Sequence, residues 1–77
     1  MEINDFIGNF ADQFDDLDTG VLNPETEFKA LENWNSLVAL SVIAMVDEEY
    51  DVILKGNDIK EASTIKDLFN IVNSKLE

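Results

Sequence analysis

The sequence predicts an all-α fold, a small four-helix bundle in which the third helix is short and a long loop joins helices one and two. Apolar residues recur at the i, i+3, i+4 and i+7 spacing of amphipathic helices near both ends of the chain. The 77 residues include no cysteine, and small domains without disulfides or thiolate metal sites rely mostly on helix packing. Because 45% of the residues are apolar and regularly spaced, we expect one folded domain over residues 1–77.

The first helix is predicted from about Ile3 to Leu17, with its apolar residues on one face and most of the nearby acids opposite. Gly8 in its interior either weakens the helix by about 1 kcal/mol relative to alanine or marks a close contact. Gly20 suits a left-handed turn that would end the helix after Asp18 and Thr19. The residues of the apolar face are Ile3, Phe6, Ile7, Phe10, Phe14 and Leu17.

A long connection over residues 18–35 follows the first helix. Loops of this length are uncommon in compact domains unless they are functional or anchored, so we expect an ordered, packed segment. Pro24 to Glu27 should form a helical turn, with Asn23 before the proline as its cap. Four apolar side chains are expected to anchor the segment: Val21, Leu22, Phe28 and Leu31.

The second helix is predicted to begin at Ser36, with Asn35 as its N-cap, and to end near Tyr50. Apolar residues cover more than one of its faces. The stripe suited to the core contains Ala39, Val42, Ile43, Val46 and Tyr50, and a second stripe contains Leu37, Leu40 and Ala44. Val38 and Met45 add to the apolar circumference of the helix. Such a helix is either buried centrally or shared between the core and a partner, and the pattern leaves both readings open.

The rest of the chain reads as an extended run, a turn and two further helices. Val52 to Leu54 form the extended run, Lys55 to Asp58 the turn, and residues 58–62 a short third helix. The last helix should start at Thr64, whose hydroxyl can cap it, while Asp67 three residues later suits the positive helix end. Its inward face is expected to contain Ile65, Leu68, Phe69, Val72 and Leu76.

Composition restricts the chemistry of this chain. Seventeen Asp and Glu against five Lys give a formal charge of −12, with no histidine. Such a surface repels nucleic acid and anionic lipid, favours partners that present Lys and Arg, and opposes self-association, so we expect a monomer. Without histidine or cysteine, a Ser-His-Asp triad and a His- or Cys-ligated zinc are impossible. Catalysis by carboxylates or Tyr50 remains open, but nothing in the spacing pairs these groups, and we expect no enzyme, no catalytic residue and no metal site.

The sequence pattern argues against a transmembrane helix and against a calcium-binding loop. No apolar run approaches the ~20 residues of a transmembrane helix, and no basic segment precedes an apolar one at the N-terminus, so a cytoplasmic location without membrane insertion is expected. The acid-rich run Asp15 to Gly20 fails as a calcium-binding loop, because Leu17 and Thr26 fall at positions that need ligands. Loose divalent binding to the acidic surface remains open.

Ser36 has the clearest functional context in the sequence. It stands on the first turn of an apolar helix that leads into the acidic cluster Asp47 to Asp51. A hydroxyl in this setting is a reasonable attachment point for a prosthetic group and a poor place for a lone catalytic nucleophile, because no general base accompanies it.

The chain resembles the acyl carrier proteins over almost its whole length. The run Asn35-Ser36-Leu37 stands where that family has Asp-Ser-Leu, and Trp34 before it is similar to the Trp-Asp-Ser-Leu variant of specialised carriers. The amphipathic first helix, the long loop, the acidic end of the second helix and the capped last helix complete the resemblance.

The resemblance implies that a phosphopantetheinyl transferase joins the 4′-phosphopantetheine of coenzyme A to Ser36 as a phosphodiester, between Asn35 and Leu37. The chain would then be a phosphoprotein that holds acyl groups as thioesters for fatty acid, polyketide or related biosynthesis, with the thiol supplied by the cofactor. The implied partners besides the transferase are acyl-loading, synthase and acyltransferase enzymes with basic docking patches.

The resemblance also implies a docking surface on the second helix, formed by Leu37, Leu40, Met45, Asp47 and Glu48. Asn35 replaces the usual Asp, and Val38 and Ser41 stand where familiar fatty acid carriers are often acidic, which favours a dedicated carrier with its own partners. Three alternatives stay open: a carrier of an amino acid or other non-fatty group, a carrier-like fold with an unmodified serine, and a regulatory domain that binds a partner helix. The cargo, and whether it enters the bundle, is not determined by the sequence.

Overall fold

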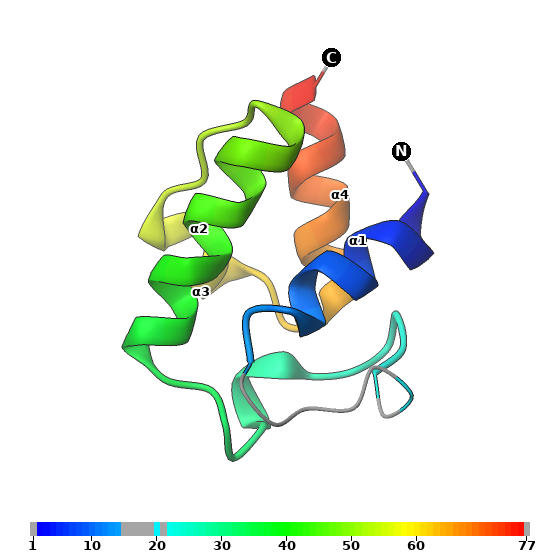
Figure 1. The fold of residues 1–77 in the computed structure, drawn as a ribbon, viewed down its shortest axis with the longest axis vertical. Helices are drawn as coiled ribbons and strands as arrows, with labels where there is room; N and C mark the ends of the chain where they lie inside the picture. Colours follow the sequence, from blue (N-terminus) through cyan, green and yellow to red (C-terminus); the bar gives the residue numbers. More distant parts are fainter. Residues whose placement is uncertain (1, 15–19, 21, 77) are drawn as a thin grey trace.

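A computed structural model describes residues 2–14, 20 and 22–76, and every structural statement below concerns these residues. They form four α-helices: α1 (Ile3–Ala11), α2 (Ser36–Tyr50), α3 (Gly56–Glu61) and α4 (Ile65–Leu76). A short 3₁₀ helix, η2 (Phe28–Ala30), lies in the long connection between α1 and α2. Figure 1 shows this connection running past the base of the bundle, at the end away from the two termini. The all-α fold and its short third helix are confirmed, and none of the described helices is long and apolar enough to cross a membrane.

Helix α1 is shorter than its apolar pattern predicts, ending at Ala11 and not near Leu17. The chain tightens there into i→i+3 turns, in which the Gln13 N–H donates to the Phe10 carbonyl and the Phe14 N–H to the Ala11 carbonyl, both at 3.1 Å. The run of acids from Asp12 onward explains the early end, because negative charge is unfavourable at a helix C-terminus. Phe14 is nevertheless buried, so the apolar spacing continues past the helix.

The expected helix end at residues 18–20 is therefore wrong, and Gly20 does not cap α1. Leu17, Asp18 and Thr19 lie outside the described residues. Of the two readings of Gly8, the structure favours the weakening one, because a Cβ added there meets nothing within 4 Å.

The long connection is tied to the start of α4 by backbone hydrogen bonds. The Ile65 N–H donates to the Thr26 carbonyl at 3.1 Å and the Lys66 N–H to the Pro24 carbonyl at 2.9 Å, which satisfies two of the N–H groups that a helix start leaves without intrahelical acceptors. Asn23 caps the turn as expected, because its side-chain oxygen accepts the Glu25 N–H at 2.8 Å, and its own N–H donates to the Thr26 hydroxyl at 2.9 Å. The described apolar anchors are Leu22, Phe28 and Leu31, whereas Val21 lies outside the described residues.

The later helices follow their predicted capping signals. Helix α4 is preceded by Thr64, whose hydroxyl accepts the Asp67 N–H while the Asp67 carboxylate accepts the Thr64 N–H, both at 3.1 Å. Helix α3 begins at Gly56, two residues earlier than expected, because the Asp58 carboxylate accepts the Lys55 N–H at 3.0 Å and so caps the start. The extended run from Val52 to Leu54 is present as predicted, with no helix assigned between α2 and α3.

The core joins the long connection to the helices through a cluster of aromatic rings. Trp34, just before α2, stacks on Phe10 with ring centroids 6.2 Å apart and meets Phe28 edge-on at 4.9 Å. Because aromatic pairs contribute about 0.5–1.5 kcal/mol beyond their buried area, these contacts fix the chain where it enters α2. The largest fully buried side chains are Phe6, Phe10, Phe28, Ile65, Leu68, Val42, Val46 and Val72.

Candidate functional site

The start of α2 is set by Asn35 and leaves Ser36 at the surface. Asn35 is extended (φ −155°, ψ 178°), its side-chain oxygen accepts the Val38 N–H at 2.9 Å, and its carbonyl accepts the Ala39 N–H at 3.0 Å. Ser36 is the first helical residue and is exposed. The predicted helix start and N-cap are therefore confirmed, and a modifying protein can reach the Ser36 hydroxyl.

The helical repeat explains why Ser36 faces outward. Val42 and Val46, one turn apart, point into the core of the bundle. Ser36 and Leu40 are likewise one turn apart, on a different side of the helix, and both are exposed. Trp34 packs into the core two residues before Ser36, so the chain is anchored just ahead of an exposed hydroxyl.

The N-terminal end of α2 suits an anion attached to Ser36. The first turn of the helix contains no acidic residue. Backbone N–H groups at a helix start lack intrahelical acceptors and carry partial positive charge, so they tolerate a phosphate nearby. Asn35 occupies one of these N–H groups, that of Val38, while its uncharged side chain adds no repulsion.

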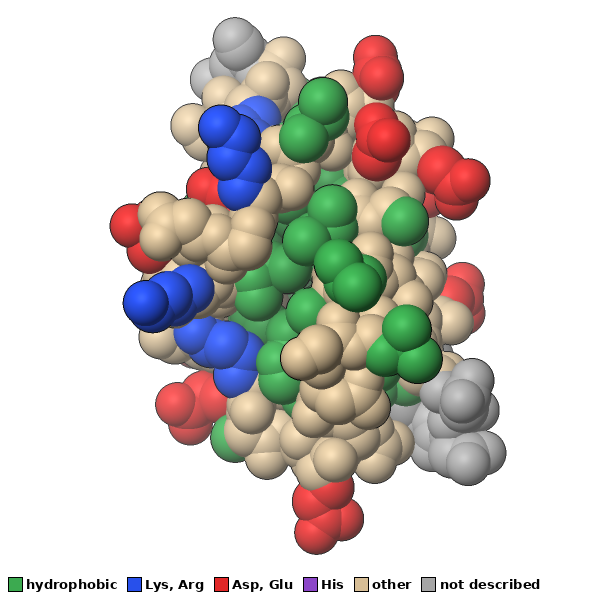
Figure 2. All heavy atoms as spheres, turned by 90° about the vertical axis from the view of Figure 1, so that its left-hand side faces the viewer, with side chains coloured by type: hydrophobic (Ala, Val, Ile, Leu, Met, Phe, Trp, Pro, Cys, Tyr) green, Lys and Arg blue, Asp and Glu red, His purple; other side chains and the backbone are tan. Residues whose placement is uncertain are grey.

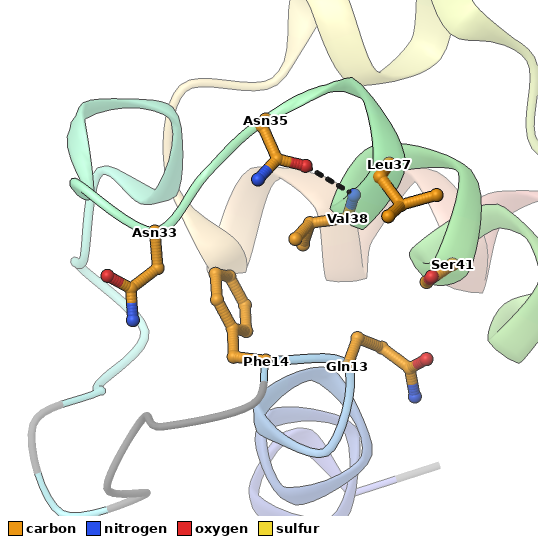
Figure 3. Close-up of a pocket in the computed structure, with 7 residues that line it drawn as sticks. All are labelled: Gln13, Phe14, Asn33, Asn35, Leu37, Val38 and Ser41. Carbon is orange, nitrogen blue, oxygen red and sulfur yellow. Dashed lines mark hydrogen bonds between the residues drawn. The ribbon is translucent and has the colours of Figure 1, made fainter.

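A cleft of about 350 Å³ flanks this helix start, between the end of α1 and the first turns of α2 (Figure 3). The figure shows the Phe14 ring rising between Asn33 and Val38, with the Gln13 side chain turned along α2 toward Ser41. The described lining carries no charged side chain, which is notable in so acidic a chain. Its residues are Gln13, Phe14, Asn33, Asn35, Leu37, Val38 and Ser41. Ser36 is not among them, so the cleft borders the serine without containing it.

The second apolar stripe of α2 is exposed, so this helix is not buried centrally: one side packs in the core and another faces the surface. Leu37 is 73% exposed and Leu40 is 63% exposed, and Ala44 is also at the surface. Met45 does not belong to this stripe, because it is 5% exposed and lies beside Val46 in the core. The expectation that Met45 docks partners is therefore corrected: a residue three positions after Val42 falls on the buried side of the helix.

The C-terminal end of α2 is strongly acidic. Asp47, Glu48 and Glu49 are all exposed, and the last turn contains no basic residue. Negative charge at a helix C-terminus opposes the helix dipole and destabilises the helix by about 0.3–1 kcal/mol for each exposed group. Asp51 ends the helix with a left-handed backbone (φ 56°), a conformation that glycine adopts with less strain. These acids do not favour the stability of α2, so a binding role explains them better.

Ile53 is an exposed apolar residue that the sequence reasoning did not single out. It is 71% exposed, between Val52 at 4% and Leu54 at 3%. Its exposure could have been predicted from the extended run Val52 to Leu54, because successive side chains of an extended segment point to opposite sides. Figure 2 looks onto the side of the molecule at the left of Figure 1 and shows apolar side chains gathered in the middle of that face. Lysines lie on one side of them, interspersed with some Asp and Glu, and further Asp and Glu lie on the other side.

The described residues contain no cluster of three or more Asp and Glu placed to hold a metal ion. The acid-rich run at residues 15–18 lies outside the described part of the chain. Tyr50, the one tyrosine of the sequence and the last residue of α2, accepts a hydrogen bond at its hydroxyl from the Asn9 side-chain amide at 2.8 Å. The site as described therefore offers one exposed hydroxyl at a helix start, an apolar stripe and an acidic helix end.

Comparisons with known proteins identify the same region. A family model described as "phosphopantetheine attachment site" matches residues 6–72, which span most of the chain and include Ser36. The members of this family carry covalently attached 4′-phosphopantetheine and act as carriers that interact with phosphopantetheinyl transferases and synthases. Searches of curated proteins and of solved structures return no match.

Proposed function

The chain belongs to the phosphopantetheine-attachment family of carrier proteins, and from that premise we propose that its Ser36 holds the 4′-phosphopantetheine arm on which acyl intermediates travel as thioesters. The observation that supports this assignment is the exposed Ser36 hydroxyl at the capped start of α2, inside the matched region. Asn35 and Leu37 flank the attachment point, Asn35 by fixing the helix start and Leu37 by presenting an apolar contact.

The attachment step requires only the hydroxyl from this chain. The Ser36 oxygen attacks the phosphorus of coenzyme A that bears the pantetheine arm, its proton passes to a base of the transferase, and the adenosine bisphosphate leaves. The product is a phosphodiester with one negative charge next to the first N–H groups of α2, where the helix dipole favours an anion. When bound, the arm supplies the thiol that this cysteine-free chain lacks.

Partner enzymes are proposed to dock on the surface around the arm. Leu37 and Leu40 offer exposed apolar contacts one turn apart, and Asp47 and Glu48 place negative charge at the far end of the same helix. Charges at the rim of an interface mainly speed and orient encounter, so basic patches on acyl-loading, synthase and acyltransferase enzymes suit this surface. The chain itself performs no catalysis in this proposal, and a cytoplasmic location and a monomeric state remain part of it.

Fatty acid, polyketide or a related biosynthesis is the proposed context, and an amino acid or other non-fatty cargo is the alternative. The cargo depends on the loading enzyme and not on the fold. The uncharged lining of the cleft beside α2 and the absence of acids from the first turn of α2 favour a dedicated carrier over a general one. One domain over residues 1–77 is sufficient for the proposed role.

The test is incubation of the apo protein with coenzyme A and a broad-specificity phosphopantetheinyl transferase. The intact mass is expected to rise by one 4′-phosphopantetheine group in the wild type and not in Ser36→Ala. Ser41→Ala, which removes a hydroxyl from the same helix, is the matched control and should be modified like the wild type. An unmodified wild type, next to a control carrier that is modified, would contradict the proposal and favour an unmodified interaction domain.

A further inference from the structure

We propose that this carrier docks through a surface of two opposite charges, and that its partner enzyme presents an apolar centre with Lys or Arg on one side and Asp or Glu on the other. This inference rests on the proposed carrier function and specifies the partner of the same site. We call the surface the bipolar face and define it by Leu37, Leu40 and Ile53 at its centre, Asp47 and Glu48 on the acidic side, and Lys55 and Lys60 on the basic side.

The centre of the bipolar face consists of large apolar side chains that the fold leaves in solvent. Leu37 and Leu40 project from α2, and Ile53 projects from the extended run after it. Burying a side chain of this size contributes roughly 1.5–3 kcal/mol, so each of the three is a favourable contact for a partner. Figure 2 shows apolar side chains forming one group on this face.

The acidic side follows from the helical repeat of α2. Asp47 is seven residues after Leu40, and Glu48 is eleven after Leu37, so each acid lies on the same side of α2 as its leucine. Both acids are exposed. A basic patch of the partner therefore suits this end of the face.

The basic side comes from the segment that enters and forms α3. Lys55 is two residues after Ile53 in an extended run, so both side chains point to the same side, and Lys60 is exposed on α3. Lys29 donates to the Lys60 carbonyl at 2.7 Å, which draws a further ammonium group toward α3.

Neither Lys55 nor Lys60 forms an ion pair with a carboxylate within the described part of the chain. The ion pair found there joins Lys75 and Asp58 at 3.6 Å and involves neither Lys55 nor Lys60. Lys55 and Lys60 are both exposed, as is Ile53. The two lysines leave positive charge available to an acidic group of the partner.

The physical consequence is specificity. A uniformly basic partner would attract Asp47 and Glu48 but would place like charges against Lys55 and Lys60. A partner with acids opposite Lys55 and Lys60 makes favourable charge contacts on both sides of the face. Figure 2 shows lysines on one side of the apolar side chains, interspersed with some Asp and Glu, whereas the other side of this view shows Asp and Glu without lysines. Such a carrier rejects enzymes whose whole docking patch is basic.

Two synthetic amphipathic helical peptides with the same leucine face test the proposal. The bipolar peptide has Lys along one edge of this face and an equal number of Glu along the other, and the basic peptide has Lys along both edges. Each is titrated into apo protein at about 50 mM salt, where charges are weakly screened, and binding is followed by NMR signals of Leu37, Leu40 and Ile53. The apo protein is used so that failure of Ser36 modification, measured by mass, stays separate from failure of docking.

The readout is the direction in which reversing the charge of Lys55 and Lys60 changes the affinity for each peptide. Lys55→Glu/Lys60→Glu is expected to lower the affinity for the bipolar peptide by about threefold to tenfold and to raise the affinity for the basic peptide. Lys66→Glu on α4 is the matched charge control and should leave the neutral bipolar peptide unchanged. Ile53→Ser should lower the affinity for both peptides. Leu76→Ser, at an exposed leucine near the end of α4, should change neither affinity.

Two results would overturn the proposal. One is a bipolar peptide that binds Lys55→Glu/Lys60→Glu as tightly as the wild type or more tightly. The other is the absence of perturbation at Leu37, Leu40 and Ile53 with both peptides. If the charge reversal unfolds α3, Lys55→Gln/Lys60→Gln replaces it and should still weaken the bipolar peptide.

Discussion

Removing the side-chain cap of α2 is expected to destabilise the protein and loosen the modification site together. Asn35 makes the hydrogen bond from the Val38 N–H at 2.9 Å, and Asn35→Ala deletes that acceptor without touching the core. Loss of an N-cap costs about 0.5–2 kcal/mol, typically ~1 kcal/mol. For a domain of this size, ~1 kcal/mol lowers Tm by about 4–8 °C. The first turn of α2 then frays more often, so the transferase should modify Ser36 more slowly.

Thermal unfolding by circular dichroism and the initial rate of mass increase with coenzyme A measure the two effects. Asn33→Ala is the matched control, because Asn33 is exposed in the same loop and makes no hydrogen bond among the described residues. Asn35→Asp keeps the cap and adds a favourable charge at the helix start, so its Tm should equal or exceed that of the wild type. A fall in Tm for Asn35→Ala no larger than for Asn33→Ala would refute this account of the site.

Three other substitutions test the local reasoning. Gly8→Ala should raise the free energy of unfolding by about 1 kcal/mol in chemical denaturation, since the new methyl group meets nothing within 4 Å; no gain would mean that the start of the chain is not helical in solution. Asp51→Gly should stabilise the protein by up to about 1 kcal/mol in the same assay, because it relieves a positive φ and removes an acid from a helix end. The backbone N–H groups of Thr64 and Ser63 lower the pKa of Asp67, so its stabilisation is complete above the ordinary carboxyl pKa and is lost as the pH falls through the lowered value. Denaturation between about pH 2 and pH 7 should accordingly show a smaller acid-induced loss in Asp67→Asn than in the wild type, and equal losses would contradict the linkage.

Local signals in the sequence were sufficient to predict where α2 and α4 begin. Asn35 before an uncharged run, and Thr64 three residues before Asp67, each specify a helix start through hydrogen bonds between near neighbours. Such bonds depend on little outside the segment, so the sequence predicts them well. The exposed position of Ser36 follows from the same cap.

The parts that were missed depend on more distant contacts. The apolar spacing of α1 continues to Phe14 although the helix does not, because a tight turn also brings that ring into the core. Met45 was expected at the surface and is buried, because the buried side of α2 around Val42 is wide enough to include it, and that width depends on the elements packed against the helix. The packing of Trp34 against Phe10 and Phe28 is tertiary, so its role in anchoring the site was not visible in the motif.

Localising the modification on protein isolated from its native host is the most direct test of the central claim. Tandem mass spectrometry of the proteolytic peptide that spans Asn35 to Val38 is expected to find a phosphopantetheine group on Ser36, with the cargo as an added mass on its thiol. A fully unmodified Ser36 in that material, or a phosphopantetheine group on another residue, would contradict it.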